Sequence, residues 1–80
     1  MRIDKFLKDS RIIKRRTIAK QACDTGRVTR GDRPMKAGDE VAVGDEINIR
    51  FGERNIKFRV KALIDSPRKD QAEEMYEMIG

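Results

Sequence analysis

The chain has 80 residues, of which 41% are charged, and 19 Lys and Arg residues against 14 Asp and Glu residues give a formal net charge of +5. A chain of this length forms one small domain that buries only roughly 60–65% of its unfolded surface, which disfavours a large substrate cavity. With no His and one Cys, a zinc site, His-based catalysis and an internal disulfide are strongly disfavoured. The longest apolar runs have three residues and the N-terminus lacks the apolar region of a secretory signal, so we expect a cytoplasmic protein without a membrane span.

The positive charge is concentrated near the N-terminus. Residues 1–38 contain twelve basic and four acidic residues, a net charge of +8, whereas residues 39–80 have a net charge of −3. Residues 1–20 alone carry eight basic residues and two acidic ones. This polarity favours an anionic polymer as the partner of the N-terminal third, although a solvated basic surface has the same composition.

The first predicted element is a short helix over residues 3–9. Ile3, Phe6 and Leu7 recur at helical spacing, which gives this segment one apolar stripe. Residues 10–16 then form a basic connection that contains two isoleucines, and these can pin the connection to the body of the domain. Two short helices joined by such a turn can present a basic face to a nucleic-acid groove.

A second short helix is expected to begin at Thr17, a good N-cap residue, and to end before Gly26, which suits the C′ position. Arg15 and Arg16 would then lie just before a helix N-terminus, where backbone N–H groups favour an anion. At this position Arg16 is expected to contribute nothing to the core. The predicted apolar face of the helix consists of Ile18, Ala19, Ala22 and Cys23.

From residue 27 the apolar period changes to two, which indicates strands. Short strands are predicted at 28–30 and 34–37, with a turn at 31–32 between them. Val41 and Val43 alternate before a turn at residues 44–45.

Two longer alternating segments then flank a two-residue turn at 52–53 and predict a hairpin whose second strand reaches Ile64. The expected cross-strand pairs are Ile49 with Ile56, Ile47 with Phe58, and Glu46 with Arg59.

The C-terminal segment is predicted to be a helix. Ser66 and Pro67 match an N-cap followed by the first helical position. Its apolar stripe would consist of Ala72, Met75, Tyr76 and Ile79. The expected organisation is a domain over residues 1–64 and a C-terminal helical extension over residues 65–80.

The order of these elements and motifs resembles the S4 RNA-binding domain from Arg2 to about Phe51. The resemblance implies an α+β, S4-like fold with two short N-terminal helices on a small, mostly antiparallel sheet and a C-terminal helix. The motifs that carry it are Arg2-Ile3-Asp4-Lys5-Phe6-Leu7, Arg15-Arg16-Thr17-x-Ala19, Gly26-Arg27-Val28, Pro34-Met35-Lys36 and Val43-Gly44-Asp45-Glu46-Ile47.

The whole chain is similar to the short stand-alone RqcP proteins of this superfamily, which are related to the heat-shock S4 protein that recycles ribosomal subunits. The resemblance implies binding to large ribosomal subunits obstructed by peptidyl-tRNA, with contacts to large-subunit rRNA and to the tRNA. It further implies that P-site tRNA is held during ribosome-associated quality control, while a partner protein performs alanine tailing. We expect a ribosome-associated monomer that needs no cofactor. The alternative within this class is subunit recycling without chain extension.

The candidate RNA-binding residues lie in the N-terminal basic region, because RNA phosphates require ammonium or guanidinium donors on one face. A second basic stripe comprises Lys57, Arg59 and Lys61, where pairing of Arg59 with Glu46 is the competing explanation. Arg27 and Lys36 could extend the first patch. The primary candidates are Arg2, Lys5, Arg11, Lys14, Arg15, Arg16 and Lys20.

Two other function classes compete with that of an RNA-binding factor. An enzyme is disfavoured because the chain offers no acid/base pair or nucleophile in a plausible pocket, so no catalytic or metal-binding residue is assigned. An adaptor for an acidic protein surface would use the same basic patch. Asp4 is expected to orient a neighbouring arginine, and Cys23 to be a small core residue. The three phenylalanines are expected in the core rather than stacked on bases.

Overall fold

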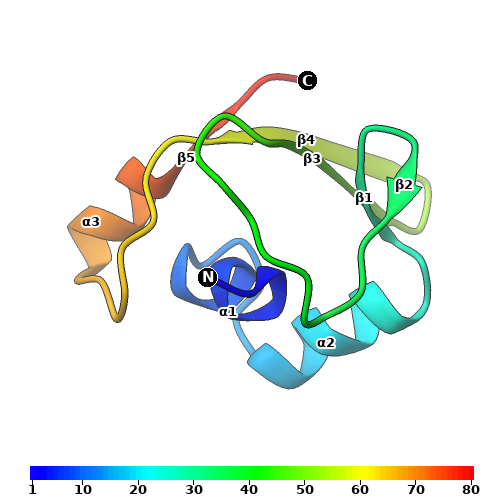
Figure 1. Cartoon of the computed structure of the whole chain (residues 1–80), viewed down its shortest axis with the longest axis horizontal. Coiled ribbons are helices and arrows are strands. Elements are labelled where there is room, and N and C mark those ends of the chain that lie inside the picture. Colours follow the sequence, from blue (N-terminus) through cyan, green and yellow to red (C-terminus); the bar gives the residue numbers. More distant parts are fainter.

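A computed structural model of the chain describes all 80 residues. Two short helices, α1 (Ile3–Asp9) and α2 (Arg16–Asp24), lie on one side of a five-stranded sheet (Figure 1). The strands follow the order β2-β1-β3-β4-β5, and every neighbouring pair is antiparallel. Their bounds are Val28–Arg30 for β1, Arg33–Pro34 for β2, Glu46–Phe51 for β3, Arg54–Val60 for β4 and Tyr76–Met78 for β5. The α+β, S4-like arrangement expected from the sequence is confirmed.

The β3–β4 hairpin has the predicted register. Glu46 pairs with Arg59, Ile47 with Phe58, and Ile49 with Ile56. Gly52 allows the tight turn because its φ of 58° is readily adopted only by glycine. The strand β4 ends at Val60 rather than at Ile64.

The core lies between the hairpin and the two N-terminal helices. The rings of Phe6 and Phe58 are stacked with centroids 6.0 Å apart, and Tyr76 meets Phe58 edge-on at the same centroid distance. Such pairs add about 0.5–1.5 kcal/mol beyond the burial of apolar area. Phe6 and Phe58 are fully buried and Phe51 partly buried, as expected for core residues. Cys23 is buried beside them.

The start of α2 differs from the prediction. Arg15 is the N-cap residue and Arg16 is the first helical residue, so the assignment of Thr17 as N-cap was wrong. No side chain caps the helix. The start instead coincides with an ion pair between Arg16 and Asp4 of α1, a tertiary contact that the local pattern does not contain. Ile18 is 46% exposed, so the buried face of α2 is narrower than predicted.

The end of α2 was predicted correctly. Gly26 has a φ of 74° and follows the C-cap residue Thr25. The N–H of Gly26 donates to the carbonyl of Cys23, and the N–H of Arg27 donates to the carbonyl of Ala22. These two bonds form a Schellman motif, in which glycine is favoured at C′.

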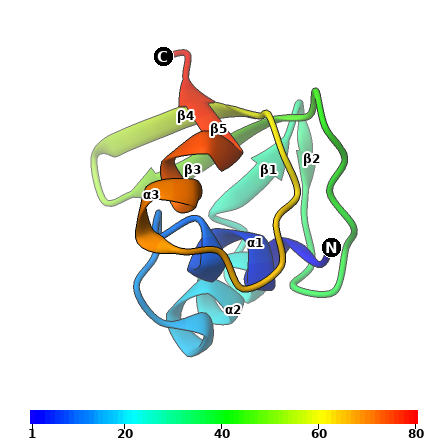
Figure 2. The same ribbon diagram turned by 90° about the vertical axis from the view of Figure 1, so that its left-hand side faces the viewer.

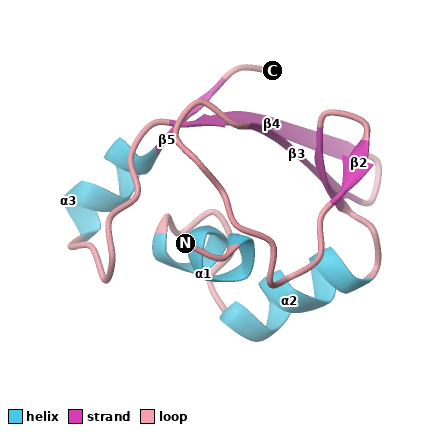
Figure 3. Ribbon diagram, in the orientation of Figure 1, coloured by secondary structure: helices cyan, strands magenta, loops and turns pink.

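The C-terminal segment contains a helix, but a much shorter one than predicted (Figures 2 and 3). The helix α3 covers only Lys69–Ala72, and a single 3-10 turn, η1, covers Glu73–Met75. The N-cap residue of α3 is Arg68 rather than Ser66. The strand β5 follows, so the prediction that Tyr76 belongs to the apolar stripe of a helix was wrong. An isolated helix of this length is marginal, whereas the extended backbone gains a ladder with β4 and packs Tyr76 on Phe58.

Between the first hairpin and β3, the chain runs without regular strands. Val41 is buried but Val43 is 62% exposed, so the predicted alternation there places only one side chain in the core. An isolated bridge joins Arg2 to Glu40, and it fixes the N-terminus against this segment. No helix in the structure has the length and apolarity that a membrane span requires.

Candidate nucleic-acid interface

A buried carboxylate organises the most prominent group of cations. Asp4 is 2% exposed, and its Oδ2 lies 3.2 Å from Nη2 of Arg2 and 3.4 Å from Nε of Arg16. Its Oδ1 accepts a 2.8 Å hydrogen bond from the backbone N–H of Lys5. We call Arg2, Asp4 and Arg16 the Asp4 cluster. The cluster confirms the expectation that Asp4 orients a neighbouring arginine, and it orients two.

The backbone on both sides of this cluster is fixed by the fold. Arg2 is the N-cap residue of α1 and is bridged to Glu40, while Arg16 is the first residue of α2. The connection between the helices is anchored by the buried Ile13, whose N–H donates to the carbonyl of Leu7 at 3.0 Å. The two arginines are therefore held side by side although they are fourteen positions apart.

Both arginines remain accessible to a ligand. Their side chains are 48% and 46% exposed, so guanidinium N–H groups not used by Asp4 face solvent. Paired guanidiniums at a fixed separation match the oxygen atoms of a phosphodiester backbone. Asp4 cancels one of the two charges, and in return it holds both guanidiniums in place before binding. Arg16 lies outside the core, as expected, but it also helps to compensate the buried charge of Asp4.

Lys5 occupies a different environment from the other candidates. Its ammonium lies 2.5 Å from Oδ2 of Asp9 and also forms an ion pair with Asp65. Hydrogen bonds to Asp65 and Asp9 raise the pKa of Lys5. This residue therefore links α1 to the segment before α3, and its charge is already compensated.

The remaining candidates are exposed, and no carboxylate lies within ion-pairing distance of them. Their charges are available to an anionic ligand without loss of an existing contact. Two of them lie on the connection between α1 and α2, the third is the N-cap residue of α2, and the fourth lies on the outer side of α2. They are Arg11, Lys14, Arg15 and Lys20. Arg27 and Lys36 are likewise exposed and unpaired.

The second basic stripe is largely neutralised. Arg59 lies 2.7 Å from Glu77 and 3.4 Å from Glu46, and hydrogen bonds to these two residues raise its pKa. Lys57 lies 3.7 Å from Glu46, and Lys61 lies 4.0 Å from Glu77. The predicted cross-strand partner of Arg59 is confirmed, and Glu77 is a second one that the C-terminal strand supplies. This face therefore offers less free positive charge than the N-terminal surface.

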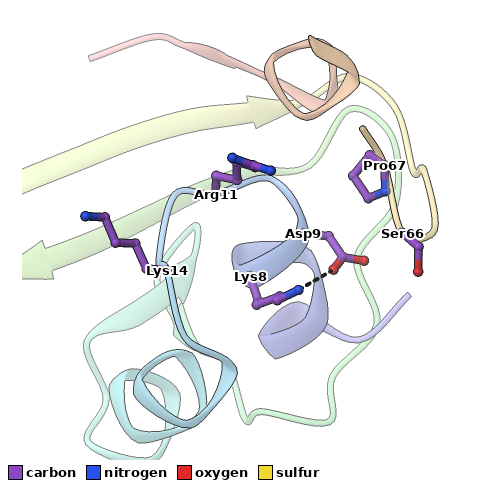
Figure 4. Close-up of a pocket in the computed structure, with 6 residues that line it drawn as sticks. All are labelled: Lys8, Asp9, Arg11, Lys14, Ser66 and Pro67. Carbon is purple, nitrogen blue, oxygen red and sulfur yellow. Dashed lines mark ion pairs between the residues drawn. The ribbon is translucent and has the colours of Figure 1, made fainter. Parts of the chain in front are cut away.

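An open, charged cleft of about 510 Å³ lies between the α1–α2 connection and the segment before α3 (Figure 4). Two of its lining residues, Arg11 and Lys14, were candidates from the sequence, whereas Lys8 and Ser66 were not. Nothing in the local sequence places residue 66 opposite the end of α1. Pro67 supplies the only apolar side chain of the lining. The lining residues are Lys8, Asp9, Arg11, Lys14, Ser66 and Pro67.

The structure gives little support to a catalytic function. Burial, the largest cause, raises the pKa of the Cys23 thiol to about 11, which keeps it protonated and unreactive at neutral pH. No group of three or more Cys, Asp and Glu side chains is arranged to hold a metal ion. The exposed candidate residues of the N-terminal region are cations, which are suited to binding an anionic ligand.

Comparison with known proteins identifies related chains at both the domain and the full-length level. The family model described as S4 domain matches residues 1–47. The RQC P-site tRNA stabilizing factor of Bacillus subtilis (strain 168) is 44% identical over 79 residues, which cover 99% of this chain and 92% of that protein. The factor of the same name from Halalkalibacterium halodurans is 46% identical over 78 residues, which cover 98% and 89%. Heat shock protein 15 of Vibrio cholerae has the same fold, with a TM-score of 0.88 at 24% identity over 99% of this chain and 81% of that one.

Proposed function

The chain belongs to the S4-domain family of RQC P-site tRNA stabilizing factors, and we propose that it binds large ribosomal subunits obstructed by peptidyl-tRNA and stabilises the tRNA in the P site. In this role it contacts large-subunit rRNA and the tRNA, and it acts in the cytoplasm during ribosome-associated quality control. It works beside a partner protein that extends the stalled chain with alanine. It is a binding factor rather than an enzyme.

The observation that carries this proposal is the Asp4 cluster. Two guanidiniums project from the starts of two different helices, and one buried carboxylate holds both. This arrangement presents two sets of N–H donors at a fixed spacing, and RNA phosphates are the acceptors that fit them. The unpaired cations of the α1–α2 connection extend the surface on one side.

Such a surface reads the shape of an RNA more than its sequence. A-form RNA exposes its phosphates and 2′-hydroxyl groups along a wide, shallow minor groove. The aromatic rings of the chain are in the core or partly buried, so stacking on splayed bases is not the main source of affinity. Specificity for obstructed subunits then comes from the simultaneous presence of rRNA and tRNA at one place, which increases avidity.

A tagged version of the protein recovered from cells with stalled ribosomes tests this function. The expected result is a molar ratio of tRNA to large-subunit rRNA near one in the recovered particles, with little small-subunit rRNA. Arg2→Ala and Arg16→Ala should reduce recovery, whereas Arg54→Ala, which removes an exposed and unpaired cation on the hairpin, should not. If recovery survives complete ribonuclease digestion, the partner is an acidic protein surface instead.

Subunit recycling without chain extension remains the alternative within this class. The likeness to heat shock protein 15 supports the fold, whereas the relatives at 44% and 46% identity bear the quality-control name. The recovered particles separate the two functions. Alanine tails on the recovered nascent chains would favour quality control, and untailed chains alone would favour recycling.

A further inference from the structure

The basic cleft between α1 and the segment before α3 shares no residue with the Asp4 cluster. Three of its six lining residues are basic and one is acidic (Figure 4). The acidic one, Asp9, is already paired with Lys5 at 2.5 Å. The lining therefore has an excess of positive charge, and its only apolar side chain is the ring of Pro67.

The cations of the cleft are free to bind. Arg11 and Lys14 are exposed and have no acidic partner within ion-pairing distance. The ammonium of Lys8 lies 3.9 Å from Asp9, at the limit of an ion pair, and its side chain is 53% exposed. An anion in the cleft would thus contact three cations without breaking a close ion pair.

The backbone of the cleft is strained on both walls. The chain contains two non-glycine residues with a positive φ, Arg11 at 65° and Ser66 at 48°, and both line this cleft. Arg11 occupies the C′ position after α1, where glycine is the usual residue. Strained residues cluster at functional sites, and they persist only where the surrounding structure holds the backbone in place.

The second wall is held in place by an ion pair. Asp65 immediately precedes Ser66 and bonds to Lys5, which lies one helical turn before Asp9 on α1. The hydrogen bond to Lys5 lowers the pKa of Asp65, so the tether is intact at neutral pH. The cleft is therefore a defined gap between two anchored segments.

We propose that this cleft is a second phosphate-binding site, in which Lys8, Arg11 and Lys14 bind neighbouring phosphates of structured RNA and Ser66 forms part of the facing wall. The proposal rests on the function proposed above and adds a second contact point to the Asp4 cluster. Two such points on one rigid surface fix the orientation of the protein on the RNA, which a single point does not.

The test measures affinity for a short fluorescein-labelled RNA duplex by fluorescence anisotropy over a series of salt concentrations. Lys14→Met and Arg11→Gly are each expected to lower the magnitude of the slope of log affinity against log salt by about 1. Each variant should bind the duplex about eightfold more weakly at 0.1 M salt. One phosphate contact gives a slope of about −0.9, so it strengthens binding about eightfold at 0.1 M salt relative to 1 M salt. Arg54→Met is the matched control, and it should change neither quantity.

Arg11→Gly also separates binding from folding. Glycine adopts a positive φ without penalty, so this variant should melt at the wild-type temperature or above while it binds RNA less tightly. Wild-type slopes for both variants would overturn the proposal, as would weaker binding with unchanged slopes. Selection of obstructed subunits is measured separately with the wild-type protein. Its absence would refute the proposed function, and the duplex results would still decide the cleft.

Discussion

The Asp4 cluster predicts that two arginines share the stabilisation of one buried charge. In Arg16→Ala, Asp4 keeps the guanidinium of Arg2 at 3.2 Å and the N–H of Lys5 at 2.8 Å. Arg16 is half exposed and its contact is long, so its loss should cost less than about 1 kcal/mol of unfolding free energy. Arg2→Ala should cost a similar amount for the same reason.

The double variant is a different case. It leaves a carboxylate that is 2% exposed with a single backbone N–H donor. Removal of the partners of a buried charge typically costs about 3–5 kcal/mol, and the two shortened side chains admit water that offsets part of this. We expect the double variant to lose about 2–3 kcal/mol, more than the sum of the two single variants.

A third substitution separates the fold from the function. Asp4→Asn in the double-variant background removes the buried charge but keeps an oxygen that can accept from Lys5. It should recover most of the lost stability in urea unfolding followed by circular dichroism. Binding to large subunits should not recover, because each arginine contributes about 1–3 kcal/mol through charged hydrogen bonds. Additive losses in the double variant, or no recovery of stability on adding Asp4→Asn, would refute this account of the cluster.

Three further predictions concern the core, the thiol and the tether. Phe6→Ala removes a ring stacked on Phe58 and should cost about 3–5 kcal/mol, measured by urea unfolding; a loss below about 1 kcal/mol would contradict the packing. The native Cys23 thiol has a pKa of about 11, so the folded state keeps a proton that the unfolded state releases, and wild-type stability should fall more steeply than that of Cys23→Ala as pH rises above about 9. Parallel pH profiles would refute this. Asp65→Ala removes an acid near a basic surface, yet it should weaken binding to the RNA duplex because it releases the Ser66 wall, whereas the exposed-acid control Asp70→Ala should bind equally or slightly better. Tighter binding by Asp65→Ala would mean that its charge matters more than the tether.

Local patterns were sufficient to predict the hairpin. Alternating apolar residues on both sides of a two-residue turn determine a register, because a slip of one residue would expose every inward side chain. The paired residues Ile47 and Phe58 follow from this counting alone. The role of Gly26 could be predicted equally well, since the positive φ that follows the helix involves one residue and glycine adopts it readily.

The errors arose where contacts distant in sequence decide the outcome. The start of α2 coincides with an ion pair of Arg16 with Asp4, twelve positions away. The C-terminal strand forms because β4 offers an unpaired edge, although residues 72–79 have helical apolar spacing. In the C-terminal strand a tertiary contact thus overrides local propensity.

The sequence indicated which residue types form the candidate site, but not which of these residues are free to bind a ligand. Charge and resemblance identified seven basic residues of the N-terminal region as candidates but not Lys8, which lines the cleft. The sequence could not show that Lys5 is compensated by Asp65, sixty positions away, while Lys14 is free. Which cation is available to RNA depends on where the acidic residues lie in the folded chain.

The most direct test of the central claim is the dissociation constant of the protein for purified large subunits that carry peptidyl-tRNA, compared with the same subunits empty. The account predicts tighter binding to the occupied subunits, since rRNA and tRNA are contacted together. It also predicts that Arg16→Ala weakens this binding roughly 5–150-fold, the equivalent of about 1–3 kcal/mol. Equal affinity for occupied and empty subunits would contradict the claim that the protein recognises P-site tRNA on the ribosome.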